Sequence, residues 1–135
     1  MAHCRLSLGH HEDVCVSDFA VGQPRMEAYQ RHVLICTGGF CSPDRRGRQL
    51  YSLLAKLLER EDLLFGPTRV KRGETPCLGV CIGGPIVVVY PDGVWYAGVT
   101  PALLERIVVE HLKHGRVVEE AVFHRLSTTP GTGQR

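Results

Sequence analysis

Two pairs of cysteines constrain this chain more than any other feature. Cys36 and Cys41 follow a short apolar run, and Cys77 and Cys81 lie on a loop rich in glycine and proline. Two thiols are too few to hold an iron–sulfur cluster, whereas four thiolates are the ligand set of a 2Fe–2S cluster. The fold must then bring two loops together from different parts of the sequence. We interpret the four cysteines as the ligands of one 2Fe–2S cluster.

The composition is that of an ordinary globular domain. Of the 135 residues, 44% are hydrophobic and 22% are charged, and the formal net charge of +2 does not suggest a nucleic-acid-binding protein. The longest apolar run, residues 86–89, is far too short to span a membrane, and no secretory signal begins the chain. We therefore expect a cytoplasmic protein that binds neither nucleic acid nor membrane. In that compartment six cysteines favour ligands or redox groups over structural disulfides.

The sequence divides into a domain and two tails. Residues 1–30 show no sustained period and predict a flexible N-terminal extension, although they contain Cys4 and Cys15, whose spacing matches no zinc motif. Met26 is an alternative start, because the folded pattern begins only at residue 31. We expect one domain over residues 31–126 and a flexible C-terminal tail over residues 127–135.

The first half of this domain predicts a strand, a helix and a weak strand. The strand lies at residues 33–35, and Ser42 or Asp44 would cap the helix that follows. Leucines recur at helical spacing from residue 50 to residue 58, which indicates an amphipathic helix of about four turns. The second strand, expected at residues 68–71, has little apolar content.

The second half predicts a hairpin, a helix and an extra strand. A buried strand at residues 86–90 leads to Asp92-Gly93, a two-residue turn, and to a return strand at residues 94–97. Thr100 should cap a second helix with Pro101 at its first position, an apolar stripe over residues 103–112, and Gly115 at its end. Residues 117–126 form an extra strand or a docking arm. This order predicts an α/β fold with a mixed sheet and two main helices, with both cysteine pairs at one end of the sheet.

Several other uses of cysteine fit this pattern less well. A plant-type cluster would need a third cysteine where Asp44 stands, and no histidine accompanies either pair, as a Rieske centre would require. A closed zinc site remains an alternative, because its ligand spacing is similar. Thiol–disulfide catalysis lacks its Cys-x-x-Cys motif.

No other constellation of residues predicts an active site. Ser, His and Asp show no telling spacing, so we expect a protein without substrate turnover of its own. The scattered histidines are expected to be surface or capping groups: His32, His111, His114 and His124.

The domain resembles the thioredoxin-like 2Fe–2S ferredoxins. The resemblance rests on Cys-x4-Cys after the first strand, on Cys-x3-Cys later, and above all on Gly-Pro-Ile-Val-Val-Val-Tyr-Pro-Asp-Gly-Val-Trp-Tyr at residues 84–96. It implies a thioredoxin-like fold, a homodimer, and a 2Fe–2S cluster on Cys36, Cys41, Cys77 and Cys81. The implied function is one-electron transfer between redox proteins. An alternative is an electron-input module of a larger NADH-dehydrogenase-like complex, because such subunits share the cysteine pairs.

Basic residues accompany both cysteine pairs. Arg45, Arg46 and Arg48 follow the first pair, and Lys71 and Arg72 precede the second. If the loops converge, these cations would surround the cluster end and attract a partner with an acidic docking surface.

Overall fold

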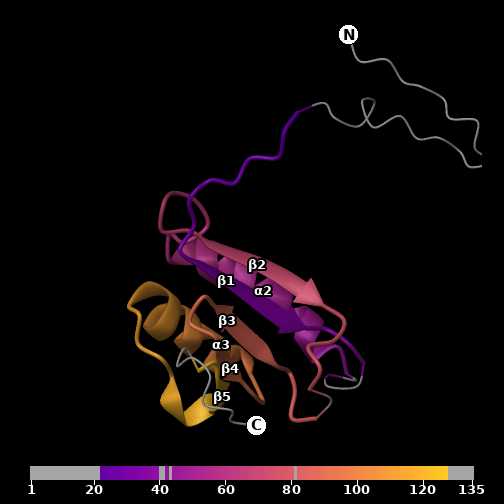
Figure 1. Cartoon of the computed structure of the whole chain (residues 1–135). Helices are drawn as coiled ribbons and strands as arrows, with labels where there is room; N and C mark the ends of the chain where they lie inside the picture. The colour runs from indigo at the N-terminus through magenta and orange to yellow at the C-terminus, as the bar shows by residue number, and fades with distance from the viewer. Residues whose placement is uncertain (1–21, 40–41, 43, 81, 128–135) are drawn as a thin grey trace, which may run out of the picture.

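The computed structural model describes residues 22–39, 42, 44–80 and 82–127, and its helices and strands are arranged around one sheet (Figure 1). In chain order the elements are β1 (Arg31–Cys36), α2 (Arg46–Arg60), β2 (Val70–Thr75), β3 (Val87–Tyr90), β4 (Val94–Tyr96), α3 (Pro101–Arg106), the π-helical segment η1 (Ile107–Lys113), the short 3₁₀ segment η2 (Glu119–Ala121) and β5 (Val122–Arg125).

The sheet is mixed, as the sequence predicts. Its strand order is β2-β1-β3-β4-β5, with β1 and β2 parallel and the other pairs antiparallel. The parallel pair is joined through α2, whereas the β3–β4 hairpin is local. Within the part of the chain that the structure describes, no helix is long and apolar enough to cross a bilayer.

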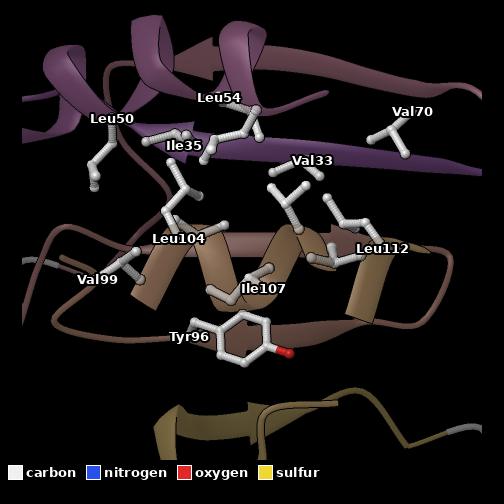
Figure 2. Close-up of a cluster of buried hydrophobic side chains, with 14 of the residues drawn as sticks. Val33, Ile35, Leu50, Leu54, Val70, Tyr96, Val99, Leu104, Ile107 and Leu112 are labelled. Carbon is white, nitrogen blue, oxygen red and sulfur yellow. The ribbon is translucent and has the colours of Figure 1, made fainter. Parts of the chain in front are cut away.

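The core lies between both helices and one face of the sheet (Figure 2). Val33 and Ile35 pair with Val89 and Val87, so these four side chains share one face because side chains alternate along a strand. The predicted apolar stripes cover that face and are buried: Leu50, Leu54, Leu57 and Leu58 of α2, and Leu104, Ile107, Val108 and Leu112 of α3 and η1.

The start and end of the second helix agree with the prediction. The Thr100 hydroxyl accepts a hydrogen bond from the Leu103 amide at 3.1 Å, and Pro101 occupies the first turn. Gly115 follows the helix with φ of 73°. The prediction missed a change of pitch, because the chain continues from α3 into the π-helical segment η1.

Three local predictions are corrected. Val89 pairs with Val94, so the hairpin connection holds four residues rather than two, and the Gly93 amide donates to the Val89 carbonyl at 2.8 Å. The N-cap of α2 is Arg45, with φ of 65°, rather than Ser42 or Asp44. Ser42 still contributes, because its Oγ accepts from the Gly47 amide at 2.7 Å. The second strand is Val70–Thr75, shifted toward the second cysteine pair.

The end of the predicted N-terminal extension contacts the domain. The Gln30 amide donates to the Arg69 carbonyl at 2.8 Å, and Glu27 pairs with the Arg69 guanidinium at 3.3 Å. Residues 22–30 are otherwise exposed. The predictions for residues 1–21 and 128–135 lie outside the described residues.

Candidate metal centre

The loops that carry the two cysteine pairs meet at one end of the sheet, where the parallel strands β1 and β2 finish. Cys36 is the last residue of β1 and pairs in register with Thr75, the last residue of β2, because the two strands are parallel. The Thr37 amide donates to the Thr75 carbonyl at 2.8 Å, and the Cys36 amide donates to the Ile86 carbonyl at 3.0 Å. The chain on both sides of the Cys77 loop is thereby fixed beside Cys36.

Two glycines allow this close approach. A Cβ atom on Gly38 would lie 1.8 Å from the carbonyl oxygen of Pro76, the residue before Cys77. A Cβ on Gly47 would lie 2.3 Å from the carbonyl oxygen of Cys36, where α2 crosses the end of β1. Both obstacles are backbone atoms that cannot move aside, so these positions exclude any side chain.

The two described cysteines of the pairs lie in different environments. Cys36 is fully buried, next to Ile86, with Leu78, Val80, Trp95 and Ala97 packed around them. Its Sγ lies 3.8 Å from the Pro76 carbonyl oxygen. Cys77 is exposed, and its Sγ accepts a hydrogen bond from the Gly79 amide at 3.2 Å. A bond of this kind stabilises negative charge on sulfur, which tunes an iron–sulfur centre.

The structure describes two of the four predicted ligands. Cys41 and Cys81 lie outside the described residues, as do Cys4 and Cys15. Over the described ranges no group of three or more His, Cys, Asp or Glu side chains is placed to hold a metal. Cys36 takes part in a disulfide in this structure, and it can bind iron only after reduction to a thiolate. This end of the sheet fits an iron–sulfur cluster, because it offers the buried Cys36 sulfur, the exposed Cys77 sulfur with an amide donor, and apolar neighbours.

The five predicted cations do not form one ring. Arg45, Arg46 and Arg48 lie at the start of α2, beside the cysteine loops, and are exposed. Lys71 lies 5.5 Å from the centroid of the Tyr29 ring, and the Arg72 guanidinium lies 4.4 Å from that of Tyr51. Lys71 and Arg72 are neighbours on β2, so their side chains point to opposite faces of the sheet. They lie four and three residues before Thr75, roughly 10–13 Å along the strand from the cysteine end. The basic surface at the cysteine end is therefore that of α2.

Comparison with known proteins identifies the family. No family model matches the chain. The chain is 35% identical over 115 residues to "Ferredoxin, 2Fe-2S" of Aquifex aeolicus, and the aligned region covers 85% of this chain and 89% of that protein. The chain belongs to the 2Fe–2S ferredoxin family. It is also 36% identical to a protein of the same description from Clostridium pasteurianum, over 67% of this chain and 92% of that protein.

Solved structures give the same result for the fold. The thioredoxin-like [2Fe-2S] ferredoxin from Aquifex aeolicus aligns with a TM-score of 0.63 and 33% identity, over 73% of this chain and 94% of that one. The thioredoxin-like fold and the family predicted from the sequence are both confirmed. Neither the input-module alternative nor the zinc alternative is favoured by these relatives.

One buried group of this family member was wrongly predicted from the sequence. His111, expected at the surface or as a cap, is fully buried in η1. Its Nδ1 lies 2.8 Å from the Tyr96 hydroxyl, and its Nε2 lies 2.6 Å from Asp92 Oδ2. The helical spacing indicates this burial, because position 111 lies four residues after Ile107 and seven after Leu104, on the buried stripe.

The charges of this buried group follow from its surroundings. Burial lowers the pKa of His111 below its ordinary value, although the hydrogen bond and charge of Asp92 oppose this. Burial would raise the pKa of Asp92, but hydrogen bonds from His111 and Arg31 outweigh it, and the pKa is lowered. Burial raises the pKa of Tyr96 to about 12. At neutral pH the network therefore joins a neutral imidazole to an ionised carboxylate.

Proposed function

We propose that Cys36, Cys41, Cys77 and Cys81 hold a 2Fe–2S cluster and that the protein carries one electron between redox proteins, without substrate turnover of its own. Family membership supports electron transfer. The observation that carries the ligand assignment is the meeting of the two cysteine loops, where Gly38 lies directly against Pro76.

The residues around the sulfurs would each perform a distinct task. A bound cluster supplies the one-electron redox chemistry. Cys36 fixes the inner side of the site from the rigid end of β1, and the Ile86 and Trp95 side chains keep water from its sulfur. The Gly79 amide offsets negative charge at Cys77, and Thr75 holds the loop through its hydroxyl, which donates to the Cys77 carbonyl at 3.1 Å. The exposed Cys77 side is the side from which an electron can leave.

The ligand assignment is tested by replacing cysteines one at a time. Cys36→Ala and Cys77→Ala should strip or cripple the cluster, seen as loss of visible absorbance, of the electron paramagnetic signal and of acid-labile sulfide. Cys41→Ala and Cys81→Ala should do the same, whereas the matched controls Cys4→Ala and Cys15→Ala should keep all three signals. Wild-type protein that contains zinc without labile sulfide would refute the cluster, and a fully loaded Cys77→Ala protein would refute the ligand set.

We further infer that the protein acts in the cytoplasm as a homodimer and docks an acidic surface of its partner. The dimer is supported by a sheet face that no described helix covers, where the Leu34 and Trp95 side chains are half-buried in the single chain. The acidic partner is supported by the exposed arginines at the start of α2. The cytoplasm is supported by the use of cysteines as ligands, and cell fractionation would check it.

A further inference from the structure

A hollow of about 260 Å³ opens between the first turns of α2 and α3. Its lining combines apolar and polar side chains from the two elements: Arg46, Gln49, Leu50 and Leu53 of α2, and Val99, Thr100 and Pro101 at the start of α3. Leu53 is half-buried, and Arg46, Gln49 and Pro101 are exposed, so the apolar floor is reached from solvent past polar groups.

Both walls of the hollow are attached to the candidate metal centre. On one wall, the Val99 amide donates to the Pro85 carbonyl at 3.1 Å, and the Gly98 amide donates to the Gly83 carbonyl at 2.7 Å. On the other wall, Gly47 of α2 lies directly against the Cys36 carbonyl. A protein that fills the hollow would therefore sit beside both cysteine loops.

The rim of the hollow on the α2 side is positively charged. Arg46 lines the hollow, and Arg45 and Arg48 are exposed at the same end of α2 without lining it. Asp44, which pairs with Arg46, is the single acidic side chain among described residues 44–48. The first turn of α2 contains no acidic residue, so the positive end of a fifteen-residue helix adds to these charges. The lining residues at the start of α3 carry no charge.

We propose that this hollow is the docking site for the redox partner, and that the partner is a protein presenting an apolar side chain surrounded by carboxylates. The proposal rests on the proposed function, because it names where an electron acceptor or donor would bind. The apolar side chain would be buried against Leu53 and Val99, and the carboxylates would meet Arg46 at the rim and be attracted by the neighbouring charges of Arg45 and Arg48. Desolvated apolar anchors give affinity, whereas surrounding charges give encounter rate and selectivity.

Two variants separate the apolar and the charged contributions. Gln49→Glu adds one negative charge at the rim with little change of shape, and Leu53→Ala removes apolar lining without changing charge. Each has a matched control outside the hollow: Gln30→Glu, just before the opposite end of β1, and Leu64→Ala, beyond the end of α2. All proteins are reduced, and stopped-flow absorbance then follows electron transfer to an acidic flavodoxin and to a basic cytochrome c.

The two variants should behave differently with salt. Gln49→Glu should slow transfer to flavodoxin about two- to five-fold at low salt, as one exposed charge pair would, and should not slow transfer to cytochrome c. Leu53→Ala should slow transfer to flavodoxin about three- to ten-fold at both low and high salt, because lost apolar contact is not screened. Both controls should match the wild type, and all proteins should keep the wild-type potential.

Flavodoxin rates of Gln49→Glu and Leu53→Ala equal to that of the wild type, or slowed no more than in the controls, would remove the hollow as a docking site. Failure of the proposed function gives a different result, because the purified protein would then lack the cluster spectrum before any rate is measured.

Discussion

Two neighbouring glycines that look equivalent in the sequence are not equivalent in the structure. A Cβ on Gly38 would meet the Pro76 carbonyl oxygen at 1.8 Å, whereas a Cβ on Gly39 would meet nothing within 4 Å. Gly38 is therefore the position at which the first cysteine loop contacts the second. Gly38 thus permits contact between the two loops, whereas Gly79 acts through its backbone amide, which donates a hydrogen bond to the Cys77 sulfur.

Gly38→Ala should destabilise the protein and loosen the cluster. Moving the loops apart resembles overpacking of a core, which costs about 1–3 kcal/mol. In a domain of this size each kcal/mol lowers the melting temperature by about 4–8 °C. Thermal melting followed by circular dichroism, with iron content measured in parallel, checks this. Gly39→Ala is the matched control, and equal melting temperatures for the two variants would contradict the assigned contact.

At the scale of residues, the sequence predicts the four cysteines as ligands, whereas it does not indicate the groups that would support them. The spacing of the cysteine pairs indicates a cluster, because ligand chemistry limits where thiolates can lie. Contacts between backbone atoms, such as Gly38 against Pro76, have no sequence signal because they depend on how two distant loops approach. The apolar stripe indicates burial of position 111, whereas the titratable side chain of His111 favours the surface, and in the structure the stripe is the better guide.

At the scale of elements, a chain of hydrogen bonds joins β4, the hairpin turn and η1. The Val118 amide donates to the Tyr96 hydroxyl at 3.2 Å, so that hydroxyl can donate its own proton to Nδ1 of neutral His111. Nε2 of His111 then carries the proton and donates to Asp92, which also accepts from Arg31 at 3.1 Å. Every group has a partner only while the imidazole is neutral.

This network predicts that stability falls as the pH is lowered below about 6.5. The pKa of His111 is lower in the folded protein than its ordinary value of 6.5, so below that pH the unfolded chain binds the proton more readily. The stabilisation is complete above pH 6.5 and is lost as the pH falls toward the folded pKa, with a slope of at most about 1.4 kcal/mol per pH unit. Urea unfolding between pH 5 and pH 8 measures it.

Two substitutions isolate the contribution of this histidine. His111→Gln should flatten the dependence on pH between pH 5 and pH 7, whatever its effect on stability at pH 8. His114→Gln, at the exposed end of the same helical segment, should leave the slope unchanged. A slope that survives in His111→Gln would show that another group is responsible.

Elements were predicted well where one pattern determined them. The leucine stripe gave α2, the Thr100-Pro101 pair gave the start of α3, and the apolar run gave β3. The prediction of the hairpin turn was wrong, because contacts with distant residues outweigh the local preference of a dipeptide. The Asp92-Gly93 pair suggested a two-residue turn, but Asp92 binds Arg31 and His111, and the connection widens to four residues.

At the scale of the whole molecule, the two faces of the sheet differ. Both helices cover the face that carries Val33 and Ile35, whereas the described residues place no helix over Leu34, Val88 and Trp95. Val88 is nevertheless fully buried, and Trp95 packs edge-on against Phe123, with ring centroids 6.3 Å apart. This second face is the surface available to the proposed dimer, away from the helices that form the hollow.

The boundary of the domain is predicted to lie between Met26 and Arg31, and two shortened chains test it. A chain that begins at Met26 keeps the Glu27–Arg69 ion pair, the Gln30–Arg69 hydrogen bond and the cation–π contact of the Lys71 ammonium with the Tyr29 ring. It should therefore melt at the wild-type temperature, retain the cluster and sediment as a homodimer. A chain that begins at Arg31 loses all three contacts and should be less stable by about 1–2 kcal/mol, the sum expected for one backbone hydrogen bond and one exposed ion pair.

Thermal melting measures the stability of both shortened chains, and sedimentation velocity measures their oligomeric state. If the Met26 chain melts substantially lower than the full chain, residues 1–25 belong to the folded domain; if it sediments as a monomer while the full chain is dimeric, those residues hold the dimer together instead of the uncovered sheet face.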